Sequence, residues 1–367
     1  MRFYAPTNVY VEKNCVENHK KELTALGSRA YIITGRHSAK ANGSYADVTA
    51  VLDEAGISYV LFDEIEENPS IETVMKASAI GIEEKVDYVI GIGGGSPLDA
   101  AKAIALMIAN PDEDQSCLYN PKDLASPLPF AAIPTTCGTG SEVTPNAVLT
   151  RHDIKTKGSI KYNIYPQLAL VDGKYLASAS RNLLINTSVD ALAHLVESRL
   201  HKKANVYNYM FSEYGLKLWS GLIPYLKEEK ELDEAAYGQF MLTSTIAGMA
   251  IAQTSTSLPH ALSYALTYRR NVAHGKACGL FLAAYLEEYA KNRSEDVETV
   301  LSLLGFDSVA AFGAFLNSIL AAETISAEEL DLYTDELVNN AGKLATYPFE
   351  ISRDAIRTIV EKSLVIA

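Results

Sequence analysis

Strand-like and helix-like segments alternate through the first half of the chain, and this alternation limits the possible folds more than any other feature. Short runs rich in apolar and β-branched residues predict strands at 30–35, 58–63, 87–95, 130–136 and 168–172. Stretches with helical periodicity lie between several of them, at 47–55, 71–85 and 97–108. Strands separated by helices predict a parallel sheet with helices on both faces.

The second half of the chain has a different pattern. From about residue 182 onward, long stretches of helical periodicity follow one another with few strand-like runs between them. A chain of 367 residues has room for about two domains. We therefore expect an α/β domain over residues 1–179 and an all-α domain over residues 180–367.

Composition excludes several classes of protein. The net charge is −13 and no basic run offsets it, which argues against nucleic acid or an anionic membrane surface as a partner. The N-terminus lacks the apolar core of a signal peptide, and no apolar stretch approaches the roughly 20 residues of a membrane span. Scattered thiols without a CxxC pair fit a reducing compartment, so we expect a cytoplasmic protein. The cysteines are Cys15, Cys117, Cys137 and Cys278.

A glycine-rich turn follows the third predicted strand, in the sequence YVIGIGGGSPLDAAKAI (residues 88–104). Ser96, Pro97 and Asp99 predict a helix start, with Ser96 as N-cap and Asp99 completing a capping box. Such a turn directs backbone N–H groups to the positive end of a helix dipole, which suits a phosphate group. It also fits a plain tight turn, because the usual dinucleotide fingerprint lies on the first strand and has a glycine where Ser96 stands here.

A second polar turn, PTTCGTGSEVT (134–144), follows the fourth predicted strand. Alone, it fits either a ligand-binding loop or an ordinary loop rich in serine and threonine. Open parallel sheets bind ligands at the carboxyl ends of their strands, where both turns are predicted to lie. Two such turns together favour a nucleotide site.

Three of the seven histidines lie in suggestive positions in the helical half. Asp190 and His194 are four residues apart, hence on one face of a predicted helix. His260 and His274 each lie in an apolar setting near a predicted helix start. One aspartate with three histidines suits a divalent metal such as Fe²⁺ or Zn²⁺. Taken singly, these residues also have structural explanations, for example Asp190 as a first-turn carboxylate and His260 as a core histidine.

The chain resembles the iron-containing (group III) alcohol dehydrogenase family in four motifs: GGGSPLDAAK (93–102), PTTCGTGSEVT (134–144), VDALAH (189–194) and HALSYALTYRRNVAHG (260–275). The resemblance covers nearly the whole chain. It implies a dehydroquinate synthase-like fold, with a Rossmann-like dinucleotide-binding domain followed by a helical domain. It also implies that the metal ligands are Asp190, His194, His260 and His274. Cys278 lies four residues beyond the last of them, but these four are already a complete set.

By the same resemblance, the cofactor pyrophosphate lies on the glycine-rich turn and the second turn lines the rest of the cofactor. The implied binding residues are Gly93, Gly94, Gly95, Ser96, Asp99, Thr135, Thr136 and Thr139, with Lys157 as a further match. Many members carry another histidine four residues after the third metal ligand, where this chain has Tyr264. A tyrosine can donate a hydrogen bond but is a poor base at neutral pH. Tyr264 is therefore a candidate donor on the substrate side, and the general base is left unassigned.

The residues after the strand at 30–35 bear on the choice of cofactor. An NAD site generally presents a carboxylate at the end of an early strand, where it binds the ribose hydroxyls. This chain has Gly35 there, followed by Arg36, Ser38 and Lys40. A small residue leaves room for a 2′-phosphate and a guanidinium can bind it bidentately, so we expect NADP(H) in preference to NAD(H). The alternative is that Gly35 only allows a tight turn and that the cations are solvated.

These inferences predict a metal-dependent oxidoreductase that interconverts a primary alcohol and its aldehyde by hydride transfer, with the metal as Lewis acid. The alternatives are a glycerol-dehydrogenase-like polyol oxidoreductase and a dehydroquinate-synthase-like lyase, because these enzymes share the architecture. A metal- and nucleotide-binding sensor without turnover is the non-enzymatic alternative. The family resemblance also suggests a homodimer, in which a strand at residues 3–11 pairs across a two-fold axis.

Overall fold

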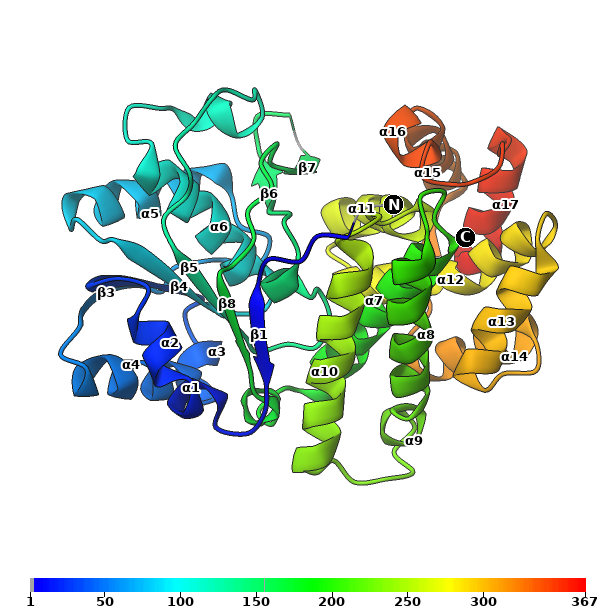
Figure 1. Ribbon diagram of the computed structural model, residues 1–367. Coiled ribbons are helices and arrows are strands. Elements are labelled where there is room, and N and C mark those ends of the chain that lie inside the picture. The colour runs from blue at the N-terminus through cyan, green and yellow to red at the C-terminus, as the bar shows by residue number, and fades with distance from the viewer. Residues whose placement is uncertain (1–2, 155) are drawn as a thin grey trace. The chain divides into compact units, whose positions relative to one another are not determined.

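The computed structural model describes residues 3–154 and 156–367, which form two compact units (Figure 1). An α/β unit comprises Ala5–Ala179 and Asp233–Thr245. A helical unit comprises Ser180–Leu232, Ile246–Ala367 and residues 3–4. Because residues 233–245 pack with the α/β unit, the division into domains of residues 1–179 and 180–367 stays a proposal.

Six strands form the sheet of the α/β unit, and all pair in parallel, which confirms the predicted parallel arrangement. They are β1 (Asn8–Val11), β2 (Arg29–Thr34), β3 (Ser58–Phe62), β4 (Tyr88–Gly93), β5 (Phe130–Pro134) and β8 (Leu168–Val171). Their order is β1-β8-β5-β4-β2-β3, so the strand that leads into the glycine-rich turn is central. Every residue of β4 and β5 is buried, which explains why these strands are continuous apolar runs in the sequence.

Helices cover both faces of this sheet (Figure 1). Successive side chains of β2 enter two separate cores, with Tyr31 and Ile33 in one and Ala30 and Ile32 in the other. The first core includes helices α5 (Ile71–Glu83) and α6 (Gly95–Ala109). The second includes α1 (Cys15–Asn18) and α4 (Ser44–Glu54), near the short helices α2 (Lys20–Thr24) and α3 (Ser38–Ala41). The expected helices on both faces are therefore confirmed.

Several short elements of the α/β unit escape prediction from the sequence pattern. Strands β6 (Val148–Arg151) and β7 (Thr156–Ser159) form an antiparallel hairpin, and 3₁₀ turns span Gln115–Leu118, Ser141–Val143 and Gly173–Leu176. The sequence of β7, TKGS, has no apolar residue, so it carries no strand signal. This hairpin is functionally relevant because it carries Lys157.

The helical unit begins with α7 (Arg181–Leu200), most of whose residues are buried. The other helices are α8 (Val206–Ser220), α9 (Ile223–Leu226), α10 (Glu234–Ile251), α11 (Leu258–Arg270), α12 (His274–Ala290), α13 (Ser294–Leu304), α14 (Val309–Ile319), α15 (Ala327–Val338), α16 (Ala341–Leu344) and α17 (Arg353–Ser363). Helix α10 belongs to the α/β unit as far as Thr245 and to the helical unit from Ile246. The two-residue strands β9 (Thr324–Ile325) and β10 (Val365–Ile366) add one minimal parallel sheet to this otherwise helical unit.

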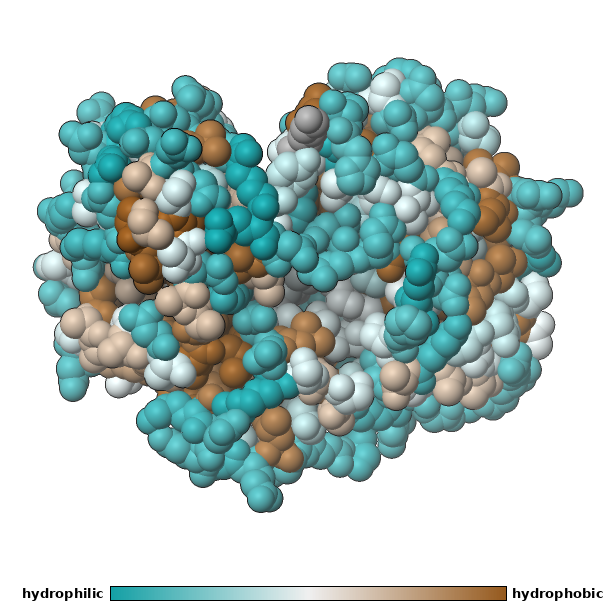
Figure 2. Space-filling view, turned by 180° about the vertical axis from the view of Figure 1, so that it is seen from behind, coloured by the Kyte–Doolittle hydropathy of each residue, from teal (hydrophilic) through white to brown (hydrophobic). Residues whose placement is uncertain are grey.

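The surface in view in Figure 2 is largely hydrophilic, with smaller hydrophobic patches. Within the described ranges, no single helix is both long enough and apolar enough to cross a membrane. The bent pair α13–α14 meets the length and composition test only when its two halves, which differ in direction by 48°, are counted together.

Candidate functional site

The glycine-rich turn joins β4 to α6 through three glycines, residues 93–95. Gly93 has a φ of 149°, and a Cβ on it would lie 2.6 Å from Cγ of Pro97, so only glycine fits. The helix begins at the last of these glycines, two residues earlier than predicted. The predicted capping box is wrong, because the Ser96 hydroxyl accepts a hydrogen bond from the backbone N–H of Asn68 at 3.0 Å instead.

The second polar turn packs directly on the first. A Cβ on Gly94 would lie 3.0 Å from the hydroxyl of Thr136, and one on Gly95 would lie 2.6 Å from the methyl group of Thr139. The backbone N–H of Thr135 donates to the carbonyl of the first glycine at 2.9 Å. The structure therefore brings the two predicted turns together at the N-terminus of α6, where free backbone N–H groups suit an anion.

The side chain of Asp99 supports the second turn. Its Oδ1 accepts a hydrogen bond from the Ser141 hydroxyl at 2.6 Å, and its Oδ2 accepts one from the backbone N–H of Val148 at 2.8 Å. The buried ammonium of Lys102 donates to the same Ser141 hydroxyl at 2.7 Å and to the carbonyl of Asn146 at 2.8 Å. Burial lowers the pKa of Lys102 to about 8. These hydrogen bonds fix the loop that carries the predicted cofactor-binding threonines. Lys102 belongs to this hydrogen-bond network, although the motif analysis did not identify it as a functional residue.

Lys157 reaches the glycine-rich turn through one intermediate residue. Its ammonium donates to Oδ1 of Asn68 at 2.7 Å, and the backbone N–H of Asn68 is bonded to Ser96. Asn68 has a φ of 59°, and its carbonyl accepts a hydrogen bond from the Thr150 hydroxyl at 2.7 Å, which fixes this strained position. Burial lowers the pKa of Lys157 to about 8. The structure thus places the predicted lysine beside the predicted phosphate site, although cofactor contact by Lys157 stays a prediction.

The end of β2 is less positive than the sequence suggests. Ser38 begins the short helix α3, and a Cβ on Gly35 would lie 3.2 Å from the carbonyl oxygen of Ile65. Lys40 forms an ion pair with Asp63 at 2.6 Å. The hydrogen bond from Lys40, with a smaller contribution from the charge of Arg36, holds the pKa of the Asp63 carboxyl below its usual value. Asp63 was missed because it follows the neighbouring strand β3 rather than β2.

The four predicted metal ligands come from three helices of one unit. Asp190 and His194 lie one turn apart on α7, His260 lies in the first turn of α11, and His274 is the first residue of α12. Their donor atoms converge. Oδ1 of the aspartate lies 3.8, 3.4 and 3.7 Å from Nε2 of the three histidines in that order. The structure therefore brings all four together in the interior of the helical unit.

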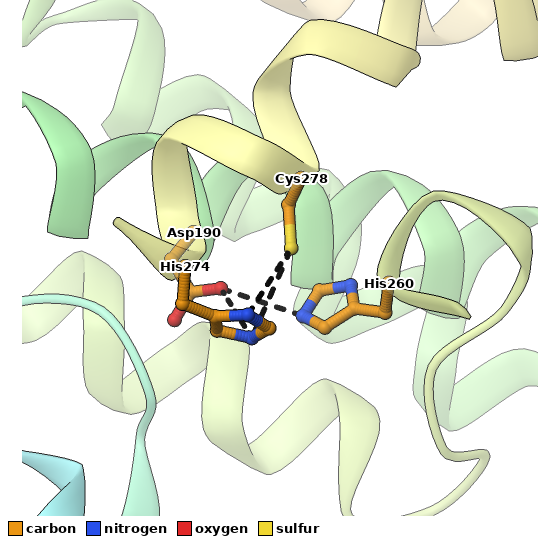
Figure 3. A group of neighbouring side chains, drawn as sticks. All are labelled: Asp190, His260, His274 and Cys278. Atoms are coloured by element: carbon orange, nitrogen blue, oxygen red, sulfur yellow. Dashed lines mark hydrogen bonds and ion pairs between the residues drawn. The ribbon is translucent and has the colours of Figure 1, made fainter. Parts of the chain in front are cut away.

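Cys278 is a fifth donor beside this cluster. Asp190, His260, His274 and Cys278 point toward a common centre, with one donor atom from each within 4.8 Å of the others (Figure 3). The Cys278 sulfur lies 3.8 Å from Nε2 of His274. Nε2 of His194 lies 2.9 Å from Nε2 of His260. Beside the candidate ligands Asp190, His260 and His274, the candidate for a fourth ligand is therefore either His194 or Cys278.

The donor set fits a divalent metal such as iron or zinc. Oδ1 of Asp190 is buried and, among the described residues, has no hydrogen-bond partner, so a buried oxygen is left for a cation. Burial opposes ionisation of Asp190, but His194, His274 and His260 together hold its pKa well below the usual range. Burial also lowers the pKa of His194 to about 4. An ionised carboxylate and a neutral imidazole, the forms that bind metal, are thus favoured at Asp190 and His194. At His260 and His274 burial acts in the same direction, but Cys278 and nearby carboxylates raise the pKa above its usual value.

Close helix packing positions these ligands. A Cβ on Gly275 would overlap the carbonyl oxygen of Asn186, so only glycine lets the start of α12 approach α7 this closely. Pro259 occupies the first turn of α11, where its missing N–H costs nothing, and Asn271 ends that helix with a φ of 54°. The resulting tight joint places His274 directly after α11.

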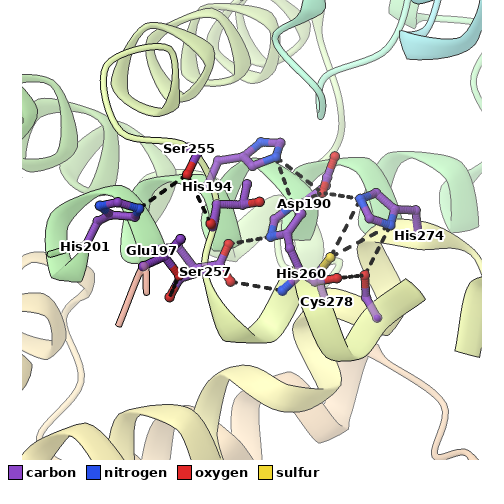
Figure 4. Close-up of polar contacts among 12 residues, drawn as sticks. Asp190, His194, Glu197, His201, Ser255, Ser257, His260, His274 and Cys278 are labelled. Carbon is purple, nitrogen blue, oxygen red and sulfur yellow. Dashed lines mark hydrogen bonds and ion pairs between the residues drawn. The ribbon is translucent and has the colours of Figure 1, made fainter. Parts of the chain in front are cut away.

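Two further residues, Glu197 and Tyr264, lie beside the cluster, and Figure 4 labels the first of them. Glu197 is fully buried and lies against Nδ1 of His260, the ring nitrogen that faces away from Asp190. The Tyr264 ring lies nearly parallel to that of His274, with centroids 6.1 Å apart and 11° between the planes. Glu197 was missed, although it follows His194 by three residues and so shares its side of α7.

An α/β unit with a glycine-rich turn, together with a helical unit that carries clustered aspartate, histidine and cysteine donors, defines a metal-dependent dehydrogenase. The chain belongs to the iron-containing alcohol dehydrogenase family. Residues 6–173 match that family's model, and residues 184–364 match the model of the C-terminal part of the Fe-containing alcohol dehydrogenases. The protein is therefore an alcohol dehydrogenase, as the sequence motifs predict.

Individual relatives match over most of the chain. An NADPH-dependent butanol dehydrogenase of Clostridium saccharobutylicum is 27% identical over 384 residues, covering 98% of this chain and 97% of the relative. A long-chain primary alcohol dehydrogenase of Thermoanaerobacter ethanolicus is 31% identical over 274 residues, covering 74% and 68%. The crystal structure of an iron-containing alcohol dehydrogenase of Thermotoga maritima matches with a TM-score of 0.91 and 36% identity, covering 99% of each chain.

Proposed function

We propose that the protein interconverts a primary alcohol and its aldehyde by hydride transfer with NADP(H). The observation that carries this proposal is the convergence of three histidine nitrogens on one buried oxygen of Asp190 in a chain of this family. A divalent iron or zinc ion bound there would supply a Lewis acid for the alcohol or aldehyde oxygen. The chemistry then needs little from a protein base, which is consistent with Tyr264 in place of the more usual histidine.

The residues of the chain have three tasks in this proposal. Asp190, His260 and His274, with His194 or Cys278, hold the ion. The glycine-rich turn at residues 93–96 binds the pyrophosphate through backbone N–H groups. The second turn and Lys157 line the remainder of the cofactor, with the threonines Thr135, Thr136 and Thr139 as contacts. Tyr264 is a hydrogen-bond donor on the substrate side.

The cofactor preference rests on the end of β2. Gly35 leaves space beside Arg36 and Ser38, and Lys40 is already paired with Asp63 at 2.6 Å, so Arg36 is the main cation for a 2′-phosphate. The butanol dehydrogenase relative is named as NADPH-dependent, which agrees with this choice. Comparison of kcat/KM for NADPH and NADH with one aldehyde tests it. Equal use of both cofactors contradicts the proposal.

The reaction class has its own test. Anaerobically prepared, metal-analysed protein is assayed with aldehydes, with glycerol and with a dehydroquinate synthase substrate. Net oxidation of NADPH on aldehydes supports the proposal, and a stronger reaction with glycerol supports the polyol alternative. Turnover without net change of the nicotinamide supports the lyase, and no turnover of metal-replete protein supports a sensor.

We also propose a cytoplasmic homodimer with small-molecule substrates. No disulfide links the four cysteines, all of which lie in the described ranges, and a reducing compartment maintains cysteines as thiols. Strand β1, which begins at Asn8 and not at the predicted residue 3, is the last strand at one end of the sheet. Among the described residues no strand pairs with its outer edge, which supports pairing with a second copy. Light scattering at micromolar concentration tests the dimer, and a monomeric mass contradicts it.

A further inference from the structure

A lysine that forms no ion pair with the described residues lies near the candidate metal site of the helical unit, where its charge acts on the buried carboxylate of Glu197. Lys343, on the short helix α16, is partly buried, and its ammonium donates to the Thr256 hydroxyl at 2.8 Å and to the Thr256 carbonyl at 3.4 Å. Throughout the described ranges, no carboxylate oxygen lies within ion-pair distance of this ammonium. Most other lysines with side-chain contacts pair with glutamate or aspartate, as Lys217 does with Glu213 at 2.8 Å.

Two ring contacts set an upper limit on the distance between this ammonium and the ring of His274. It lies 5.8 Å from the centre of the Tyr264 ring, and that ring is parallel to the ring of His274 at 6.1 Å. The ammonium is therefore no farther from the His274 ring than these two separations together. Tyr264 is the residue that the family resemblance places beside the substrate.

We propose that Lys343 and Thr256 form an anion subsite that selects substrates carrying a terminal carboxylate, a short ω-carboxy aldehyde or the matching hydroxy acid. This inference rests on the proposed function, because it assigns the far end of the substrate whose oxygen lies at the metal. It narrows the substrate class from primary alcohols in general to anionic ones.

A carbon chain of about four atoms is short enough for this upper limit. A metal–oxygen bond of about 2 Å, an extended four-carbon chain of about 5 Å and a charge-assisted hydrogen bond of about 3 Å span roughly 10 Å. This reach lies below the largest separation of the ammonium from the His274 ring that the two ring contacts allow, and 4-oxobutanoate is therefore the probe chosen for the test. The Thr256 hydroxyl, held by the ammonium, is free to donate its own proton to the second carboxylate oxygen.

The charge also works against uncharged substrates. An apolar chain that ends against a partly buried ammonium removes water from it and returns no hydrogen bond, which is unfavourable. A carboxylate replaces that water with a charge-assisted bond. Specificity therefore arises from both the attraction of the anion and the penalty on its uncharged analogue.

The test compares 4-oxobutanoate with butanal, which has the same carbon chain without the charge. We expect the wild-type protein to favour 4-oxobutanoate in kcat/KM. In Lys343→Met, the ratio of the two kcat/KM values should fall by at least about thirtyfold, mainly through KM for the anion. Lys343→Arg should retain most of the preference because it keeps the charge, and the exposed control Lys217→Met should not change the ratio.

Binding of succinate, an unreactive dicarboxylate, is measured by calorimetry as an independent readout. The wild-type protein should bind succinate and Lys343→Met should bind it at least about tenfold more weakly. An unchanged aldehyde ratio or unchanged succinate affinity in Lys343→Met overturns the subsite and leaves the dehydrogenase function standing. Absence of turnover with both aldehydes in metal-replete wild-type protein contradicts the proposed function, and the succinate measurement then decides the subsite alone.

Discussion

Glu197 contacts His260 at two points: its Oε1 accepts a hydrogen bond from the backbone N–H of His260 at 3.0 Å, and its Oε2 lies against Nδ1 of the same residue. The other ring nitrogen, Nε2, faces Asp190. A carboxylate on Nδ1 fixes the tautomer in which Nε2 is free to bind a metal, and it makes that nitrogen more basic. We therefore expect Glu197 to position His260, one of the candidate metal ligands.

The first prediction concerns this carboxylate. Glu197→Gln keeps the shape of the side chain but removes the charge, so we expect metal affinity to fall by about 10- to 100-fold. Competition with a chelator of known affinity measures this, with Glu213→Gln on the exposed face of α8 as the matched control. A variant that melts at the wild-type temperature and binds metal equally well contradicts the role.

The second prediction separates the two candidates for the fourth ligand. We expect His194→Ala and His260→Ala to lose bound metal and turnover, because each removes a nitrogen that faces Asp190. Cys278→Ser should keep metal close to the wild-type content, since a complete set remains without it. Metal analysis of the purified variants decides between them. Full metal content in both histidine variants disproves the ligand set, and loss of metal only in Cys278→Ser assigns the thiol instead.

Local patterns account for the part of the site that the sequence predicts. The strand before the glycine-rich turn is an uninterrupted apolar run, and the four-residue spacing of Asp190 and His194 places both on one helix face. Glu197 and Cys278 continue the same helical periodicity, three residues after His194 and four after His274. Helical periodicity alone did not identify Glu197 and Cys278 as site residues, because it does not predict which helices pack against each other.

Contacts between segments that are distant in the sequence account for the parts of the site that the sequence did not predict. Asp63 and Asn68 follow other parts of the sheet edge, and only the strand order brings them beside β2 and Ser96. The capping box failed for the same reason, since Asp99 binds Ser141 and Val148 rather than its own helix start. Local sequence patterns cannot predict these partners, because the partners are far apart in the sequence.

The third prediction concerns the approach of α12 to α7. Gly275→Ala places a methyl group on the carbonyl of Asn186, so the helices must separate and the metal ligands on both must move. We expect the free energy of unfolding to fall by about 3 kcal/mol and metal affinity to fall with it. Gly238→Ala on α10 is the control, because a Cβ there meets no atom within 4 Å, and it should be neutral or slightly stabilising. Equal stability of the two variants contradicts this account of the packing.

The fourth prediction is a pH dependence of cofactor use. Burial lowers the pKa of Lys157 from 10.5 to about 8, so its positive charge is present below pH 8 and is lost as the pH rises through that value. We expect kcat/KM for NADPH to fall above about pH 8, because this ratio reports groups of the free enzyme. In Lys157→Met, kcat/KM for NADPH should be lower than in the wild-type protein at pH 7 and should not fall further above pH 8. The control variant Lys203→Met should show the wild-type pH dependence. If kcat/KM for NADPH still falls above about pH 8 in Lys157→Met, a group other than Lys157 causes the pH dependence.

The fifth prediction concerns the ribose end of the cofactor. Gly35→Asp adds a carboxylate where the 2′-phosphate of NADP(H) is expected, and like charges in contact cost on the order of several kcal/mol. Its Cβ would lie 3.2 Å from the carbonyl of Ile65, a contact that a shift of a few tenths of an ångström relieves. We expect the ratio of kcat/KM for NADPH to that for NADH to fall by at least about 100-fold. Asp63→Ser should have the opposite, smaller effect of a fewfold increase, because it frees Lys40 from an exposed ion pair. If both variants leave the ratio unchanged, the phosphate does not bind at the end of β2.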